Sequence, residues 1–219
     1  MKICFLAKID KPGVEDAIAY TYKYFNKIDI FHDKNCDSIP KKLFIKKYDL
    51  IISYLSPWIV PKEVLKKTRL WNINFHPGPP SYPGIGCFNF AIYNSENTYG
   101  STAHIMESRV DTGKIIGVER FPMTKSETVI SLSQKTYYAQ LKLYKNIIKY
   151  IKEKKILPSV NEKWERIPYT RLQLEKLSTI TDKMDTEEVK RRLRSTYYPG
   201  KPAPFIKIFN FKFEYNPER

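Results

Sequence analysis

The chain has 219 residues, of which 38 are Lys or Arg and 23 are Asp or Glu, so its formal net charge is +15 at pH 7. Hydrophobic residues make up 42% of it and aromatic residues 14%, enough for the core of one domain and too much for a disordered chain. The three cysteines, Cys4, Cys36 and Cys87, form no CxxC pair, which argues against a disulfide framework or a structural metal site. Its first apolar run, Ile3–Ala7, is too short for a signal peptide or a membrane span, so we expect a cytoplasmic protein.

The excess of positive charge is compatible with two kinds of function. A basic surface attracts polyanions such as nucleic acid, anionic lipid or a phosphorylated small molecule. It also keeps a lysine-rich protein in solution. The positive residues gather along Lys145–Lys155 and Lys190–Arg194, so a polyanion-binding module remains open as an alternative to an enzyme.

Strands and helices alternate over the first 75 residues. The expected strands are residues 2–7, 27–31, 50–55 and 70–75, and the expected helices are residues 14–25 and 61–67. This order predicts an α/β fold with a doubly wound, mostly parallel sheet of the Rossmann-like kind, covered by helices on both faces.

A turn-rich segment follows the strand at residues 70–75. Residues 76–86 contain four prolines and three glycines, so they cannot continue a strand or a helix. A loop that leaves a buried strand in this way is where open α/β sheets bind their ligands. After the loop we expect a helix at 88–94, strands at 100–106 and 115–121, and a long amphipathic helix at 127–155.

The character of the chain changes beyond Pro158. Residues 164–171 are expected to be irregular, 186–194 a basic helix and 205–213 one final strand. We therefore divide the chain into a catalytic domain, residues 1–157, and a small C-terminal subdomain, residues 158–219.

Three polar residues near the ends of expected strands form a set suited to acyl transfer. Asn74 and His76 are two residues apart in an extended segment, so their side chains point to the same side. Asp111 follows 35 residues after His76, in a turn before another strand. An amide can stabilise an oxyanion, an imidazole can move a proton, and a carboxylate can orient the imidazole. No Ser or Cys occupies a nucleophile motif, so direct attack by an amine fits better than a covalent intermediate, although such residues also occur as structural parts of loops.

These residues resemble the motifs of the formyltransferase family. The segments that carry the resemblance are Asn74-Phe-His76-Pro-Gly-Pro-Pro-Ser-Tyr-Pro-Gly84, Gly100-Ser-Thr-Ala-His104, Val110-Asp111-Thr-Gly-Lys-Ile-Ile116 and Ser53-Tyr-Leu-Ser-Pro-Trp58-Ile59-Val60-Pro61. The order and spacing of an Asn-x-His motif, a proline-rich loop and an Asp-x-Gly motif are those of that family. The resemblance is specific over residues 48–120 and looser elsewhere.

The resemblance implies transfer of a formyl group from 10-formyltetrahydrofolate to an amine, with no metal. It makes Asn74 and His76 the groups that stabilise the oxyanion, and His76 and Asp111 those that handle the proton. The residues implied to bind the pterin ring of the folate are Trp58, Ile59, Val60, Val110 and Asp111. His104 matches a recurring position that supports the Asp111 loop, or is a structural histidine.

The resemblance also bears on the amine that accepts the formyl group. The loop at residues 76–86 looks most like that of the nucleotide-sugar formyltransferases, and a dTDP-linked amino-dideoxy sugar such as dTDP-4-amino-4,6-dideoxyglucose is the implied substrate, in surface polysaccharide (O-antigen) synthesis. Only one glycine follows the first strand, so a phosphate-cradling loop is missing there. The stretch after the long helix is shorter than the tRNA-binding domain of methionyl-tRNA formyltransferases, which remain an alternative. We therefore expect no nucleic-acid or membrane partner, and the resemblance implies a homodimer.

The residues that would hold the nucleotide sugar are chosen by chemistry alone. A diphosphate needs cations or backbone amides, and a base needs an aromatic face. Glycines allow the backbone to approach a sugar, or simply form turns. The candidates are Lys8, Gly84, Gly86, Arg194, Tyr197 and Tyr198.

Overall fold

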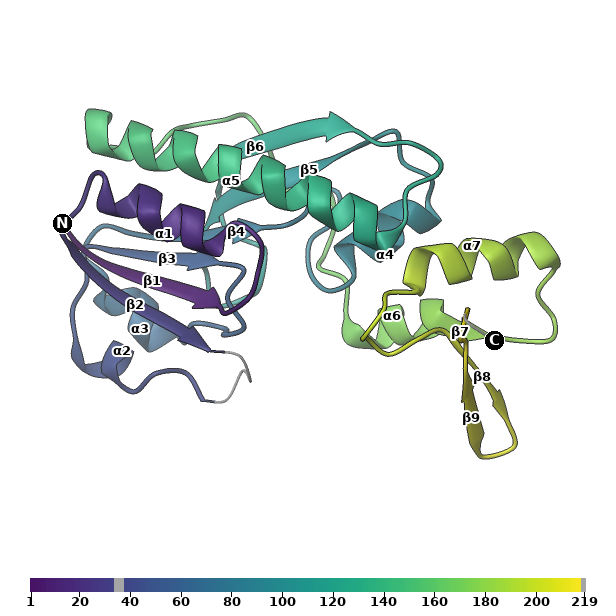
Figure 1. Ribbon diagram of the computed structural model, residues 1–219. Helices are drawn as coiled ribbons and strands as arrows, with labels where there is room; N and C mark the ends of the chain where they lie inside the picture. The colour runs from purple at the N-terminus through teal and green to yellow at the C-terminus, as the bar shows by residue number, and fades with distance from the viewer. Residues whose placement is uncertain (34–37, 218–219) are drawn as a thin grey trace.

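A six-stranded sheet lies at the centre of the larger, N-terminal part of the structure, a computed structural model that describes residues 1–33 and 38–217 (Figure 1). Its strand order is β2-β1-β3-β4-β5-β6. The strands are β1 (Lys2–Lys8), β2 (Lys27–Asp33), β3 (Leu50–Tyr54), β4 (Trp71–His76), β5 (Thr98–Ile105) and β6 (Ile115–Pro122). The first four strands are parallel to one another, whereas β5 and β6 are antiparallel to their neighbours. The predicted α/β fold with a mostly parallel sheet is therefore confirmed.

Helices cover both faces of this sheet because successive residues of its strands point to opposite faces. The helices are α1 (Val14–Tyr22), α2 (Lys42–Ile45), α3 (Lys62–Lys67), α4 (Cys87–Tyr93) and α5 (Val129–Lys154). Ile3 and Phe5 of β1 pack in one core with residues of α1 and α5, whereas Cys4 and Leu6 pack in another with residues of α2 and α3. The result is a three-layered arrangement with the carboxyl ends of the parallel strands at one edge (Figure 1).

A smaller sheet lies in the C-terminal part of the chain. It contains β7 (Thr179–Ile180), β8 (Phe205–Ile208) and β9 (Phe211–Glu214), accompanied by α6 (Arg171–Ser178) and α7 (Thr186–Thr196). The prediction of one strand over residues 205–213 was wrong, because Phe209 adopts a left-handed φ of 53° and turns the chain into the antiparallel hairpin β8–β9. The division of the chain after residue 157 stays a prediction.

The C-terminal part packs against the loop that follows β4. Tyr169 stacks on Phe90 of α4 with ring centroids 3.7 Å apart, and its backbone forms a β-bridge with Gly84. Tyr82, Tyr169 and Leu177 belong to one buried cluster. Residues that follow α5 therefore reach the proline-rich loop and hold it in place.

Neither a disulfide framework nor a membrane span was expected from the sequence, and the structure can be compared with both expectations over the described residues. Cys4 and Cys87 are free thiols in buried positions, and Cys36 lies outside the described residues. Within residues 1–33 and 38–217, no helix is long and apolar enough to cross a membrane.

Candidate functional site

The end of β4 places the first two candidate residues. β4 lies between β3 and β5, so its backbone is fixed by hydrogen bonds on both sides. Asn74 and His76 share one side of the strand, and Phe75 points the other way into the core beneath α5. His76 is only 5% exposed, and its carbonyl accepts a hydrogen bond from Ser101 Oγ at 2.8 Å. The structure thus agrees with the prediction that the side chains of Asn74 and His76 point to the same side of the strand.

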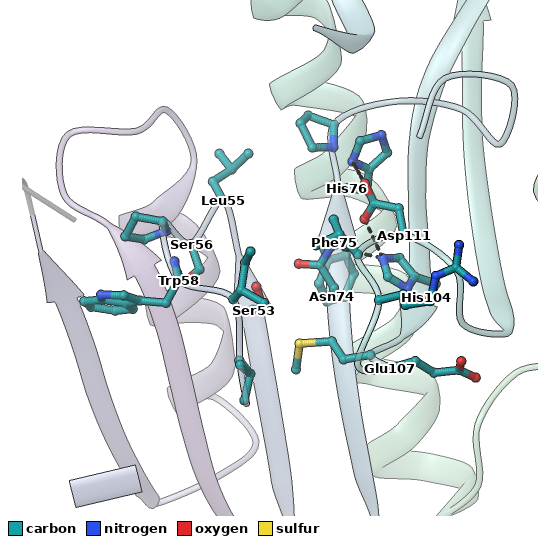
Figure 2. A pocket seen from close by; sticks show the side chains of 17 residues that line it. Ser53, Leu55, Ser56, Trp58, Asn74, Phe75, His76, His104, Glu107 and Asp111 are labelled. Carbon is teal, nitrogen blue, oxygen red and sulfur yellow. Dashed lines mark hydrogen bonds and ion pairs between the residues drawn. The ribbon is translucent and has the colours of Figure 1, made fainter. Parts of the chain in front are cut away.

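Asp111 reaches the same place from the turn between β5 and β6, where it adopts a left-handed φ of 47°. Its Oδ2 lies 3.2 Å from Nδ1 of His76, and its Oδ1 lies 3.2 Å from Nε2 of His104 (Figure 2). The backbone N–H of Gly84 donates to Oδ2 at 2.8 Å. Asn74, His76, His104 and Asp111, called the Asp111 cluster below, therefore form one network, in which Asn74 is partly buried and the other three residues are buried.

The outer contacts of the two imidazoles fix their tautomers. Nε2 of His76 lies 2.8 Å from the carbonyl of Tyr82, and Nδ1 of His104 lies 2.8 Å from the carbonyl of Ile105. Because a carbonyl oxygen only accepts, each of these nitrogens carries a hydrogen. The other nitrogen of each ring faces Asp111 and donates to it when the ring is protonated.

His104 has two partners at a single nitrogen. Its Nε2 lies 3.0 Å from Nδ2 of Asn74 and 3.2 Å from Oδ1 of Asp111. A neutral ring accepts from the Asn74 amide, whereas a protonated ring donates to the carboxylate. A proton that arrives on His104 therefore exchanges one of these hydrogen bonds for the other.

The surroundings of Asp111 keep its carboxyl group ionised. Burial raises its pKa, but the adjacent His76 and His104 and the N–H of Gly84 outweigh burial, so the pKa lies well below its ordinary value. A buried carboxylate of this kind stabilises a neighbouring imidazolium. The cluster can therefore hold a proton on an imidazole next to a fixed negative charge.

A cavity of about 210 Å³ opens in front of this cluster. Figure 2 shows Trp58 on one side of it and the imidazoles with Asp111 on the other. All the residues predicted to catalyse the reaction or to bind the pterin line this cavity: Asn74, His76, Asp111, Trp58, Ile59, Val60 and Val110. The structure thus brings together residues from three separate stretches of the sequence, 58–60, 74–76 and 110–111.

The cavity has features that a flat heteroaromatic ligand such as a pterin would use. Ile59 is 69% exposed and Val110 is 45% exposed, so apolar side chains stand uncovered at the cavity wall. The indole N–H of Trp58 is buried and has no hydrogen-bond partner among the described residues, which is costly unless a ligand or water accepts it. These observations fit a folate. The described residues contain no group of three or more His, Cys, Asp or Glu side chains arranged to hold a metal ion.

The residues predicted to hold a nucleotide sugar are not gathered at this cavity. A guanidinium nitrogen of Arg194 donates to the carbonyl of Lys125, and Tyr197 packs edge-on against Tyr215 at 5.6 Å. Tyr198 lines a different cavity, and Lys8 ends β1.

The two candidate glycines serve the packing of the chain itself. A Cβ on Gly84 would lie 2.4 Å from the carbonyl oxygen of Tyr169, and Gly84 adopts a φ of 88°. Gly86, with a φ of 77°, is the N-cap of α4. The backbone that approaches Gly84 closely is thus that of Tyr169.

Trp164, which packs against both histidines of the site, was not singled out from the sequence. The ring of Trp164 packs edge-on against His104 at 5.1 Å and against His76 at 6.0 Å. Its indole N–H donates to the carbonyl of Gly113 at 2.8 Å, in the turn that carries Asp111. Glu162 holds this segment on β6 through two bonds to Arg120, of 2.6 and 3.0 Å. Trp164 lies in an irregular segment with no motif around it, so only the folded chain reveals it.

Comparison with known proteins places these residues in context. The family model described as "Formyl transferase" matches residues 32–148. A GDP-perosamine N-formyltransferase of Brucella melitensis is 28% identical over 162 residues, which are 73% of this chain and 61% of the relative. The chain thus spans about three fifths of the length of that curated relative.

Solved structures share the fold over almost the whole chain. A sugar N-formyltransferase from Shewanella sp FDAARGOS_354 superposes with a TM-score of 0.78 at 16% identity, covering 98% of this chain and 96% of that one. An N-formyltransferase from Helicobacter canadensis, in complex with folinic acid and dTDP-3-aminofucose, gives 0.74 at 20% identity, covering 97% and 86%. At these identities the likeness concerns the fold.

Proposed function

Because the chain belongs to the formyl transferase family, we propose that it transfers a formyl group from 10-formyltetrahydrofolate to the amine of a nucleotide-linked amino sugar. The observation that carries this proposal is the Asp111 cluster at the wall of a cavity with exposed apolar side chains. A module that only binds polyanions has no use for such a cluster. The folate would supply an activated one-carbon group.

The Asp111 cluster can handle the charge and the proton of this reaction. The amine nitrogen bonds to the formyl carbon while the bond from that carbon to the folate nitrogen breaks, and the proton lost by the amine ends on that folate nitrogen. Asn74 has a second N–H besides the one near His104, so it can donate a hydrogen bond to the negatively charged formyl oxygen. Protonated His76 would add its positive charge rather than a hydrogen bond, because its two N–H groups donate to Tyr82 and Asp111. The Asp111–His76 pair holds the proton in transit.

The class of sugar is proposed from the loop at residues 76–86 and from the relatives. The loop resembles that of enzymes acting on dTDP-linked amino sugars, and one solved relative contains dTDP-3-aminofucose. The curated relative is named for GDP-perosamine. We propose dTDP-4-amino-4,6-dideoxyglucose as the substrate and the synthesis of surface polysaccharide as its purpose.

The basic clusters give the tRNA and polyanion alternatives little support. Glu187 pairs with Lys190 at 2.9 Å, and Glu188 pairs with Arg191 and Arg192 at 2.5 and 2.6 Å. In the long helix, Lys149 lies 3.9 Å from Glu153. Three carboxylates thus pair with four of the nine cations in the two clusters, three of these four in the Lys190–Arg194 cluster, which weakens the attraction of that cluster for a polyanion.

We also propose that two copies of the chain associate through the C-terminal hairpin. β9 is an edge strand of the small sheet, and its Phe211 and Phe213, like Phe209 in the turn, are exposed. An edge strand with uncovered aromatic side chains tends to pair with another chain. A second copy, which brings the same hairpin, would cover these rings.

A panel assay tests the proposed function. The protein would be incubated with 10-formyltetrahydrofolate and, in separate tubes, dTDP-linked 3-amino and 4-amino sugars, GDP-perosamine and methionyl-tRNA, and the products would be read by mass spectrometry. A gain of one formyl mass on a nucleotide sugar is the expected result. Formylation of methionyl-tRNA alone, or of nothing in the panel, would contradict the proposal.

A further inference from the structure

The chain that follows α5 is tied to elements that carry the Asp111 cluster. Glu162 pairs with Arg120 of β6 at 2.6 Å, and the backbone N–H of Glu165 donates at 3.2 Å to the carbonyl of Pro80 in the proline-rich loop. Trp164 lies between these two anchors in the sequence. Its position is therefore fixed by β6 on one side and by the loop that leaves β4 on the other.

The indole N–H of Trp164 reaches the turn that carries Asp111. It donates to the carbonyl of Gly113 at 2.8 Å. Gly113 lies so close to the carbonyl of Ile105 that a Cβ on it would collide with that oxygen, and Nδ1 of His104 lies 2.8 Å from the same oxygen. Movement of the turn would therefore disturb His104 as well as Asp111.

The ring of Trp164 covers the two histidines of the cluster. Its plane is inclined by 82° to the ring of His104 and by 72° to that of His76, with centroids 5.1 and 6.0 Å away. Both imidazoles and Asp111 are buried, whereas Trp164 is partly exposed, so the indole separates them from solvent on this side. The described residues that line the cavity of about 210 Å³ include the three buried residues but not Trp164.

We propose that Trp164 is a positioning residue for formyl transfer: its N–H holds the turn of Asp111 in place, and its ring keeps water away from His76 and His104. The inference rests on the proposed function for the reaction that it serves. Exclusion of water strengthens the interaction of an imidazolium with a carboxylate. Displacement of a reacting group by about 1 Å can slow a reaction about 10²-fold. Trp164 acts through the Asp111 cluster and not by contact with a substrate.

Steady-state kinetics of three variants test this role. Trp164→Leu removes the ring and the N–H, and it should lower kcat by about 10- to 100-fold. Trp164→Phe keeps an aromatic ring, so it should lower kcat by about two- to tenfold, the contribution of one hydrogen bond. KM for the folate and for the amino sugar should stay nearly unchanged in both. Trp71→Phe, at a partly buried indole at the opposite end of β4 from His76, is the matched control and should keep kcat and KM. Thermal melts would verify that each variant folds.

Hydrogen exchange at the imidazoles tests the cover without any substrate. In protein labelled with ¹⁵N-histidine, NMR follows the N–H groups that His76 and His104 direct at backbone carbonyls. These N–H groups should exchange slowly in the unaltered chain, in Trp164→Phe and in Trp71→Phe. In Trp164→Leu they should exchange about tenfold faster, because exchange reports the local access of water.

An unchanged kcat in Trp164→Leu, or an equal loss in Trp71→Phe, would overturn the proposal. A raised KM for the amino sugar with an unchanged kcat would make Trp164 a substrate contact and would also overturn it. If Trp164→Leu does not fold, an unchanged kcat in Trp164→Phe is the overturning result. Formyl transfer by the unaltered chain, with equally fast exchange in all four proteins, would reject the cover and keep the proposed function. Slow exchange that depends on the ring of Trp164, without transfer to any amine, would keep the cover and reject the function.

Discussion

At the scale of single residues, Asp111 is a carboxylate buried between two histidines. Its carboxylate is 4% exposed and accepts from Gly84 while facing two imidazoles. A buried charge is tolerated only when such partners replace the lost water. Asp111 thus contributes to the stability of the fold as well as to the proposed chemistry.

The pH dependence of stability should reveal the ionised state of Asp111. Its pKa is lower in the folded chain than in the unfolded one, so the carboxylate favours folding above about pH 3.9, the ordinary value of Asp, and that contribution is lost as the pH falls below it. Thermal melts should show the unaltered chain more stable than Asp111→Asn at pH 6–7, with the difference shrinking between pH 4 and pH 3. A difference that stays constant down to pH 3 would contradict this.

Trp164 offers an optical test of the site that needs no substrate. An imidazole in contact with an indole quenches its fluorescence, and more strongly when protonated. In a chain with Trp58 and Trp71 replaced by Phe, emission of Trp164 at pH 6 should rise when His104 or His76 is replaced by Asn, because both rings lie against it. A chain that keeps only Trp71 should show no such rise. Emission of Trp164 that ignores both histidine replacements would contradict the contact.

At the scale of elements, the proline-rich loop ties the strand β4 to the C-terminal part. Its Gly84 and the isolated Gly200 both have a left-handed φ, of 88° and 73°, but a Cβ meets the Tyr169 backbone at Gly84 and nothing within 4 Å at Gly200. The left-handed conformation alone costs a non-glycine residue about 1–2 kcal/mol.

Alanine substitutions at these two glycines separate the collision from the backbone strain. Gly200→Ala should lower the free energy of unfolding by about 1–2 kcal/mol and leave turnover nearly unchanged. Gly84→Ala should lower the free energy of unfolding further and also lower turnover, because the added Cβ collides with the Tyr169 backbone and displaces the backbone N–H that donates to Asp111. Urea unfolding and turnover would be measured for both variants. Equal effects would show that the contact with Tyr169 is unimportant.

Elements with a strong local signal were predictable, and those fixed by distant contacts were less so. The long helix was expected at residues 127–155 and forms at Val129–Lys154, with Thr128 and Ser131 as a capping box. The short helix α6 was missed, although Thr170 and Gln173 form the same motif. The turn at Phe209 was missed because the chain carries no glycine there, and an aromatic residue rarely adopts a positive φ.

For the whole molecule, the family expected from the motifs at residues 74–84 and 110–116 is confirmed. The common side of Asn74 and His76 follows from strand alternation, which is local. Asp111 and His104 come close to Asn74 and His76 because β4 pairs with β5 in the antiparallel direction. Trp164 reaches the cluster because a segment more than 50 residues after Asp111 packs against the turn that carries it. Sequence patterns could therefore indicate the residues of the Asp111 cluster, but not Trp164, which packs against its two histidines.

Association of two chains through the hairpin should depend on its aromatic residues. Replacing Phe211 and Phe213 by Ser removes apolar surface that is exposed in one chain, so it should convert a dimer into a monomer without loss of fold. Tyr138→Ser, at a ring that is 77% exposed on α5, is the matched control and should keep the dimer. Light scattering after size exclusion would measure the masses. A monomeric unaltered chain, or dimers in all three proteins, would refute the hairpin interface.

Transfer of a labelled formyl group tests the proposed function most directly. With 10-[¹³C]formyltetrahydrofolate and a dTDP-linked amino sugar, the label should appear on the sugar nitrogen with one tetrahydrofolate released per product. His76→Ala and Asp111→Asn should each slow transfer by about 10²–10⁴-fold, the contribution of a positioned proton-transfer group, with folinic acid binding largely retained. Label transfer at near-normal rates in either variant, or no transfer by the unaltered chain to any nucleotide-linked amino sugar, would contradict the assignment of the Asp111 cluster as a formyl-transfer centre.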